Sequence, residues 1–248
     1  IATGLPSKSL VKGRFTLKGD NYDQLIDSPF ELAEQSRFSF EANGIPHEFV
    51  ISGQHNTNLE RLKTDIEKIC QTEINMFGSA PFQNYTFMTM ATGNSYGGLE
   101  HCNSTSLITP RDDLPKADEA EEPSKDYQRF LGLCSHEYFH SWLVKFIRPE
   151  NFANYDLQKE GYTSLLWIFE GFTSYYDDLI LLRSGVISQT SYLELLKAQI
   201  DRYLQNPGRA IQSVSESSFD AWIKFYRQDE NSNNAGTSYY NKGSLVAL

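Results

Sequence analysis

The chain has 248 residues, of which 40% are hydrophobic and 22% are charged, and its formal net charge at pH 7 is −10. A chain of this length can bury a large core, as one domain of moderate size or as one domain with a smaller partner. The acidic balance and the lack of a basic stretch argue against a nucleic-acid partner, since nothing would neutralise phosphates. No apolar run in the sequence reaches the length of a membrane span.

The cysteines and the first residue of the chain give information on the cellular compartment of the protein. Cys70, Cys102 and Cys134 form an odd set at wide spacings, which argues against a disulfide scaffold and fits a reducing or an indifferent compartment. We expect all three to be buried thiols. The cytoplasm is favoured weakly, but the chain begins without methionine, which leaves a preceding signal peptide open. The oligomeric state is not assigned.

The first half of the chain is expected to form strands around one helix. Apolar and polar residues alternate on both sides of Asn43-Gly44, which is typical of a β-hairpin over 36–53. The next segment, 56–78, has apolar residues at helical spacing and ends in glycine, which predicts a helix. Further strands are expected at 84–92 and at 99–109.

The second half is expected to be helical. An acidic, proline-containing loop over 110–124 precedes it, and Ser124 can cap the first helix. The last ten residues resemble the first turns of a helix without a stop signal, so we expect a fragment that is truncated at its C-terminus. The predicted helical segments are 125–143, 163–185, 188–208 and a shorter one at 219–228, followed by a polar loop over 229–238.

The stretch His136-Glu137-Tyr138-Phe139-His140 has the pattern H-E-x-x-H. On a helix this spacing places both imidazoles on one face with a carboxylate beside them, as in zinc peptidases. Spacing alone leaves open a pair of helix histidines without a metal. A similar start at His47 lacks the second histidine, and we interpret His47 and His55 as structural.

A third ligand would decide in favour of zinc, because catalytic zinc takes three protein ligands and leaves a position for water. Glu170 is the best candidate, since it follows an apolar run whose helix is expected to be buried. A lone buried carboxylate is unfavourable, and a cation beside it removes that penalty. Glu160 and Asp156 are rivals, but each lies in a polar context that explains it without a metal.

The same cluster offers a general base. Glu137 lies next to a ligand and cannot be one itself, so its carboxylate would face the reacting water and later protonate the leaving amine. A donor for the developing oxyanion is also needed. The sequence offers Tyr239, Tyr240, His101 and several hydroxyls for this role.

A competing motif, GNSYG at 93–97, matches the nucleophile elbow of serine hydrolases. That elbow needs a strand before the serine and a helix after it. Here a strand-like run follows instead, so we interpret the glycines as allowing a close approach of the backbone to a ligand or a neighbouring segment.

Four motifs in this order, YGGLEH, HEYFHSW, WIFEGFTSYY and YYNKG, resemble the gluzincin metallopeptidases. The first of them narrows the resemblance to the glycyl aminopeptidases, metallopeptidase family sixty-one, which often carry a C-terminal PDZ domain. The resemblance extends over most of the chain, from about Pro29, and includes SPFE, RDDLP and SFDAWIKFY.

This resemblance implies an α+β fold, with a thermolysin-like catalytic domain in which a mixed sheet and a helical lobe lie on either side of the zinc. We expect residues 1–55 to be the end of a β-rich N-terminal domain and residues 56–248 to be the catalytic domain. The C-terminal helices and the PDZ domain of the family are not in this sequence. The cleft would lie between the GGLEH strand and the HEYFH helix.

The resemblance also implies roles, transferred by position. His136, His140 and Glu170 would bind one zinc ion, and Glu137 would be the base. The tyrosine of the Y-x-K-G pattern, which supports the oxyanion, falls on Tyr240 and not on Tyr239.

The GGLEH segment resembles the strand that lines the substrate in the wider aminopeptidase clan. Gly97 and Gly98 would line the substrate, and Glu100 would hold its free α-amine, because a buried ammonium group needs a fixed counter-charge. His101 would either contact the substrate or pack as a strand histidine against the helix.

One departure follows the HEYFH motif. The family commonly reads W-N-V-K-R-I-R-P, whereas this chain has Leu143 and Phe146 at the positions of the asparagine and the first arginine. Two polar groups are thereby replaced by apolar ones, which puts local contacts and substrate preference in question but not the zinc ligands.

The sequence therefore predicts a zinc-dependent aminopeptidase that acts on peptide or protein N-termini and, by resemblance, prefers small residues such as glycine and alanine. Two alternatives stay open: a non-catalytic peptide-binding module on a peptidase fold, and a zinc endopeptidase. A decayed site usually loses a catalytic residue, and this sequence keeps them all. Blocking the substrate amine would separate the two enzymes, because only an endopeptidase tolerates the block.

Overall fold

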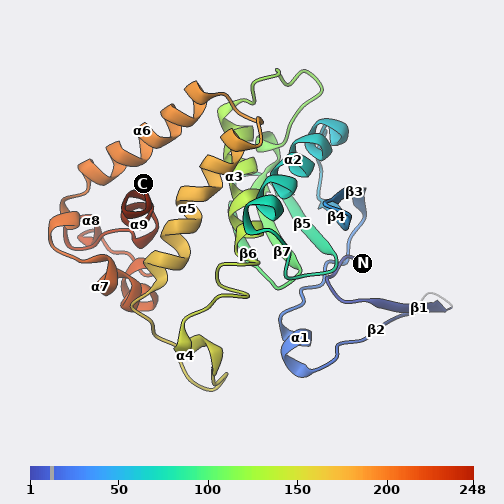
Figure 1. Ribbon diagram of the computed structural model, residues 1–248, viewed down its shortest axis with the longest axis horizontal. Coiled ribbons are helices and arrows are strands. Elements are labelled where there is room, and N and C mark those ends of the chain that lie inside the picture. The colour runs from blue at the N-terminus through green and yellow to red at the C-terminus, as the bar shows by residue number, and fades with distance from the viewer. Residues whose placement is uncertain (12–13) are drawn as a thin grey trace.

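A mixed five-stranded sheet and a lobe of helices meet along helix α3 (Lys125–Phe139) in the computed structural model, which describes residues 1–11 and 14–248 (Figure 1). The sheet has the strand order β3-β4-β5-β7-β6. Strands β4, β5 and β7 run parallel, while the edge strands β3 and β6 are antiparallel to their neighbours. The strands are β3 (Gln35–Ala42), β4 (Ile45–Ser52), β5 (Tyr85–Thr92), β6 (Gly97–Glu100) and β7 (Ser104–Pro110).

The predicted hairpin is confirmed as β3 and β4. Asn43 and Gly44 form its two-residue turn with φ values of 50° and 75°, the left-handed conformation that Asn-Gly adopts readily in such turns. Beyond the turn, side chains alternate between the two faces of the sheet. Phe49 belongs to the main core with helices α2 and α3, whereas Val50 packs with Met88 and Ala2 on the other face.

The predicted single strand at 99–109 is wrong, because the structure divides it into β6 and β7. The chain turns at residues 101–103, where the His101 amide donates to the Ser104 carbonyl oxygen at 2.9 Å. The turn contains no proline or glycine, so the sequence carried neither of the strongest turn signals there. The side chain of Asn103 explains the turn in part, since it donates to the Gly4 carbonyl oxygen at 2.8 Å.

Helix α2 (Leu59–Phe77) begins and ends near its predicted signals, and helix α3 (Lys125–Phe139) begins at its predicted cap. Gly78 ends α2 in the left-handed conformation with φ of 80°, and the Ser124 side chain caps α3 by accepting from the Tyr127 amide. The predicted end of α3 at residue 143 is wrong. The helix stops at Phe139, and residues beyond it fold back because Trp142 is buried against Phe77 with ring centroids 4.6 Å apart.

The second lobe consists mainly of helices α5 (Leu166–Arg183), α6 (Gln189–Gln205) and α9 (Tyr239–Ala247), which confirm the predicted helical segments. The predicted helix at 219–228 is wrong in detail, since α7 (Val214–Phe219) ends there and a single π turn, η3 (Ala221–Phe225), follows. The short helices are η1 (Arg111–Asp113), α4 (Glu150–Ala153), η2 (Pro207–Ala210) and α8 (Ser232–Ala235), of which α8 lies in the predicted polar loop.

The N-terminal elements β1 (Ser7–Val11), β2 (Arg14–Leu17) and α1 (Tyr22–Ile26) extend away from the sheet (Figure 1). Strands β3 and β4 precede residue 55 but share one sheet with β5. The division of the chain at residue 55 stays a prediction. In the described part of the chain, no helix has both the length and the apolar character needed to cross a membrane.

Burial decides the outcome of the predictions for His47 and for the three cysteines. His47 is structural, as expected: its ring is buried and bonds the Ile45 carbonyl oxygen and the Tyr138 hydroxyl, both at 2.8 Å. Burial lowers the pKa of His47 to about 4, so the ring is neutral. Cys70 and Cys134 are buried, but Cys102 is exposed at the β6–β7 turn, so the expectation of three buried thiols is wrong for it.

Helices α5 and α9 cross with their backbones in contact at Gly171 and Gly243. A Cβ atom on Gly243 would lie 2.6 Å from the Trp167 carbonyl oxygen and 2.9 Å from the Gly171 Cα atom. Only glycine fits on both sides of this crossing, and the crossing sets the position of the N-terminal turn of α9.

We expect Gly243→Ala to lower the free energy of unfolding by about 2 kcal/mol, because overpacking a rigid crossing forces the two backbones apart. Gly93→Ala is the matched control, since a Cβ atom there meets nothing within 4 Å. Urea unfolding of both variants measures the difference. An equal stability of the two variants would contradict the packing described for α5 and α9.

Candidate metal centre and active site

Helices α3 and α5 bring together the three predicted metal ligands. The Nε2 atoms of His136 and His140 each lie 3.2 Å from Oε2 of Glu170, and 3.1 Å from each other. All three side chains are largely buried. The sequence therefore selected, from three candidate carboxylates, the one that lies beside both imidazoles.

The second nitrogen of each imidazole already has an acceptor. Nδ1 of His140 donates to the Leu143 carbonyl oxygen at 2.8 Å, and Nδ1 of His136 donates to Oδ2 of Asp177 at 2.9 Å. With Nδ1 protonated, the neutral ring turns a lone pair on Nε2 toward the other ligands. Two such nitrogens, each on a ring that an outer hydrogen bond orients, together with a carboxylate oxygen form a donor set that zinc prefers. The residues present therefore fit a divalent metal.

Without a cation, these groups compensate one another by binding protons. Burial alone would lower the pKa of His140, but the negative charge of Glu170 outweighs it and raises the pKa to about 9. Burial likewise opposes the charge on Glu170, yet His140 and His136 hold the pKa of its carboxyl well below the usual range. The cluster thus attracts positive charge strongly, and a metal ion can supply it in place of protons.

Sequence reasoning missed Asp177. It lies on α5 seven residues after Glu170, which is two helical turns and therefore the same face. That spacing was a usable signal once Glu170 had been chosen. Asp177 holds the ring of His136 in orientation, whereas its neighbour Asp178 accepts from the Gln199 side chain at 2.8 Å.

Glu137 lies between the two histidines in sequence and is buried against the edge strand β6. A Cβ atom on Gly98 would collide with the Glu137 carboxylate, so glycine at 98 provides the space that this side chain occupies. Oε2 of Glu137 has no hydrogen-bond partner among the described residues. Burial raises the pKa of Glu137 to about 7, although both histidines oppose the rise. A carboxyl group with this pKa can accept and release a proton near neutral pH.

Glu100, at the end of β6, lies on the other side of the same space. One carboxylate oxygen each of Glu100 and Glu137 and one ring nitrogen of His140 lie within 4.8 Å of one another. Glu100 is partly exposed, so a ligand can reach it. The structure thus brings Glu100 to the proposed base and to one proposed metal ligand.

His101, the next residue, is buried beside Asp27, another residue that sequence reasoning missed. Its Nδ1 atom lies 3.5 Å from Oδ1 of Asp27. The same carboxylate accepts from Lys145 Nζ at 2.6 Å and from the Cys102 amide at 2.8 Å. Asp27 therefore joins the N-terminal segment to the β6–β7 turn and to the loop after α3, and His101 belongs to that junction.

Tyr240, on the first turn of α9, is the tyrosine beside the proposed metal ligands. Its ring centroid lies 6.1 Å from that of His136, and its hydroxyl lies 3.1 Å from the hydroxyl of Tyr226. Burial, aided by the charge of Glu170, raises the pKa of Tyr240 well above its usual range, so the phenol keeps its proton. Tyr239 is buried behind it, with the two rings stacked 4.6 Å apart.

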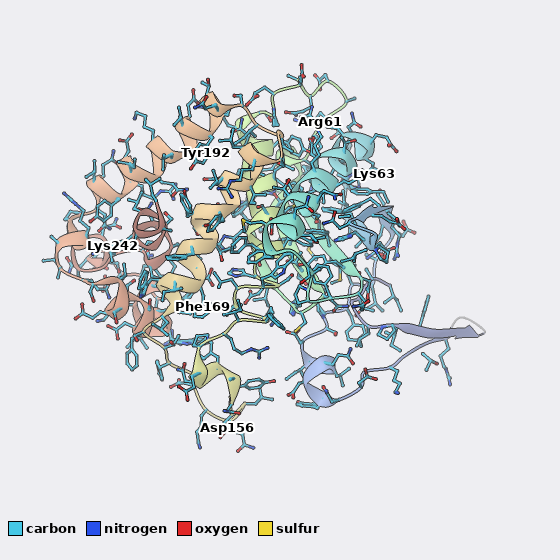
Figure 2. All side chains as sticks on the ribbon, in the orientation of Figure 1. Arg61, Lys63, Asp156, Phe169, Tyr192 and Lys242 are labelled. Carbon is cyan, nitrogen blue, oxygen red and sulfur yellow. The ribbon has the colours of Figure 1, made fainter. Side chains whose placement is uncertain are left out.

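The rival candidates lie elsewhere. Asp156 is on the outer loop after α4, well separated from Phe169 of α5 (Figure 2). Glu160 is exposed and accepts from the Tyr162 hydroxyl at 2.7 Å. Ser95 is exposed in the turn between β5 and β6, and no helix follows it, which excludes the nucleophile elbow.

The departure at Leu143 leaves the proposed metal centre intact. The contact to His140 uses the backbone carbonyl of Leu143, which any residue provides. Phe146 is 70% exposed, so the phenylalanine in place of an arginine changes the protein surface and not the ligand cluster.

Comparisons with known proteins bear on the family and the fold of the chain. Residues 129–246 match the model of the M61 glycyl aminopeptidase family. The crystal structure of an aminopeptidase N family protein from Idiomarina loihiensis shares 49% identity and a TM-score of 0.96 over 99% of this chain and 42% of that one. No curated protein sequence gives a significant match.

The fold also occurs in a more distant protein. An M1 zinc metallopeptidase from Deinococcus radiodurans, and a mutant of it, share 12% identity and a TM-score of 0.55 over 99% of this chain and 48% of theirs. At this identity the likeness shows the fold alone. This chain spans less than half the length of each of these relatives.

We expect Asp177→Asn to weaken zinc binding about 10–100-fold, because the His136 ring loses a charged acceptor that orients it. Asp178→Asn is the matched control, as the adjacent carboxylate contacts Gln199 instead. Competition with a chelating dye measures both affinities. Equal affinities in the two variants would show that Asp177 does not support the ligand.

Proposed function

The chain belongs to the M61 glycyl aminopeptidase family, and on this premise we propose that it is a zinc-dependent aminopeptidase that removes small N-terminal residues, glycine or alanine. Its substrates would be peptides or proteins with a free N-terminus. The observation that carries the proposal is the convergence of His136, His140 and Glu170, with both Nδ1 atoms already bonded, beside the buried carboxylate of Glu137.

The three converging residues would hold the zinc ion. When bound, zinc supplies a Lewis acid for the scissile carbonyl and lowers the pKa of water. The remaining steps belong to the protein side chains. Glu137 accepts the proton of the attacking water and delivers it to the leaving amine, a double role for which a pKa of about 7 is suited.

Two further side chains would bind the substrate, one at the developing oxyanion and one at the α-ammonium group. Tyr240 keeps its phenolic proton and donates it in a hydrogen bond to the developing oxyanion. Glu100 pairs with the α-ammonium group of the substrate and thereby positions the first peptide bond. The Glu100 carboxylate lies close to that of Glu137. The space between an α-amine bound to Glu100 and the base Glu137 would therefore fit one N-terminal residue better than a longer peptide segment.

Glu100 is the residue that separates an aminopeptidase from an endopeptidase. An internal peptide segment has no ammonium group to offer, and a carboxylate at this place would be left unpaired. A small N-terminal residue is expected from the family resemblance, and the glycyl aminopeptidase match supports it.

The proposal is tested with Gly- and Ala-p-nitroanilide and with their N-acetylated forms. We expect the full chain loaded with zinc to cleave only the free-amine substrates, and Glu137→Gln to lower kcat about 10²–10⁴-fold through loss of the base. Cleavage of the acetylated forms at a similar rate would support an endopeptidase. Zinc binding without any turnover would support a peptide-binding module.

We expect Glu100→Ala to raise KM for free-amine substrates at least 10-fold, since a charge-assisted contact worth roughly 1.5–3 kcal/mol is lost. Glu160→Ala is the control, because that carboxylate is exposed and accepts a hydrogen bond from the Tyr162 hydroxyl. Steady-state kinetics of both variants give the comparison. An unchanged KM in Glu100→Ala would contradict the assignment of the amine site.

A further inference from the structure

Three tyrosine hydroxyls lie together next to the proposed metal centre. The Tyr226 hydroxyl is 3.1 Å from that of Tyr240 and 3.1 Å from that of Tyr239. Tyr226 directly follows the π turn η3, whereas the other two tyrosines begin α9. Tyr239 and Tyr240 follow Tyr226 by 13 and 14 positions, and their hydroxyl groups lie beside that of Tyr226. Of the three tyrosines, the proposed function uses only Tyr240.

Packing holds the three rings in place. The ring of Phe225 lies 4.9 Å from that of Tyr239 and 5.6 Å from that of Tyr240. Ser238 caps α9 by accepting from the Asn241 amide, and Lys242 donates to the carbonyl oxygens of Arg209 and Gln212 at 2.8 and 2.9 Å. Phe225 also contacts the ring of Tyr226, with centroids 5.2 Å apart, so one phenylalanine packs against all three tyrosine rings.

Burial sets the direction of the first hydrogen bond. Tyr239 is 1% exposed, so its hydroxyl cannot donate a hydrogen bond to bulk water and donates instead to the Tyr226 hydroxyl. Tyr226 is 63% exposed and retains its own proton for a second acceptor. The Tyr240 hydroxyl lies within reach of it and can accept through a lone pair.

We infer that Tyr226 is a positioning residue that donates to Tyr240 and so directs the Tyr240 proton toward the developing oxyanion. A hydroxyl that accepts one hydrogen bond is polarised and becomes a stronger donor of the next. The order of donation is Tyr239 to Tyr226 to Tyr240 to the substrate oxygen. This inference rests on the proposed function, since it assigns Tyr226 a task only if Tyr240 supports the oxyanion.

The test uses Tyr226→Phe, Tyr240→Phe and the double variant of the full chain. We expect Tyr226→Phe to lower kcat about 5-fold, the effect of one hydrogen bond of roughly 1 kcal/mol. KM, zinc content and melting temperature should stay as in the wild type. In the Tyr240→Phe background the same change should have no further effect, because Tyr226 acts only through the Tyr240 hydroxyl.

A second measurement does not depend on turnover. With tyrosine labelled with ¹³C at Cζ, the Tyr240 resonance should shift in Tyr226→Phe of the metal-free chain. Tyr162→Phe is the matched control, because its hydroxyl bonds Glu160 on the surface, and it should leave the Tyr240 resonance in place.

The outcomes separate the two claims. An unchanged kcat in Tyr226→Phe, an equal loss in both backgrounds, or an unmoved Tyr240 resonance would overturn the inference and leave the proposed function standing. If the wild type cleaves no free-amine peptide, the proposed function fails, and the role of Tyr226 in catalysis fails with it. The labelled spectra would then still report whether Tyr226 bonds Tyr240.

Discussion

The arrangement of the candidate site depends on the two hydrogen bonds that occupy Nδ1 of His136 and of His140. Asp177 and the Leu143 carbonyl oxygen are fixed acceptors, so each ring, in its neutral form, presents a bare Nε2 atom toward Glu170. Helix α3 ends at Phe139, and this early end allows the chain to fold back and bring the Leu143 carbonyl under His140. Trp142 is buried against Phe77 within that return, so its packing supports the orientation of a proposed metal ligand.

Two glycine contacts then bring the remaining groups to the same place. Gly98 leaves space for the Glu137 carboxylate against the edge strand, and the crossing of Gly171 with Gly243 places the first turn of α9 beside α5. A Cβ atom at Gly98 would collide with the Glu137 carboxylate, and one at Gly171 or Gly243 would force α5 and α9 apart. The proposed zinc ligands, base and oxyanion donor come from helices α3, α5 and α9, and these glycines keep the base and the donor in place.

The sequence carried much of this information because part of the chemistry has a local signature. The spacing of His136 and His140, the polar Glu170 within an apolar run, and Asn43-Gly44 each indicate a structure within a few residues. Asp177 could have been found by its spacing from Glu170, but Asp27 and Tyr226 could not. Their partners lie on other elements, so only the packing of those elements reveals them. The β6–β7 turn was missed because residues 101–103 include neither glycine nor proline.

The central claim is that His136, His140 and Glu170 hold one zinc ion. The most direct measurement is the metal content of the purified chain by mass spectrometry after zinc is supplied and excess is removed, compared with Glu170→Gln. We expect one zinc per chain in the wild type and little in the variant. No bound zinc in the wild type, or an equal content in both proteins, would contradict this ligand assignment.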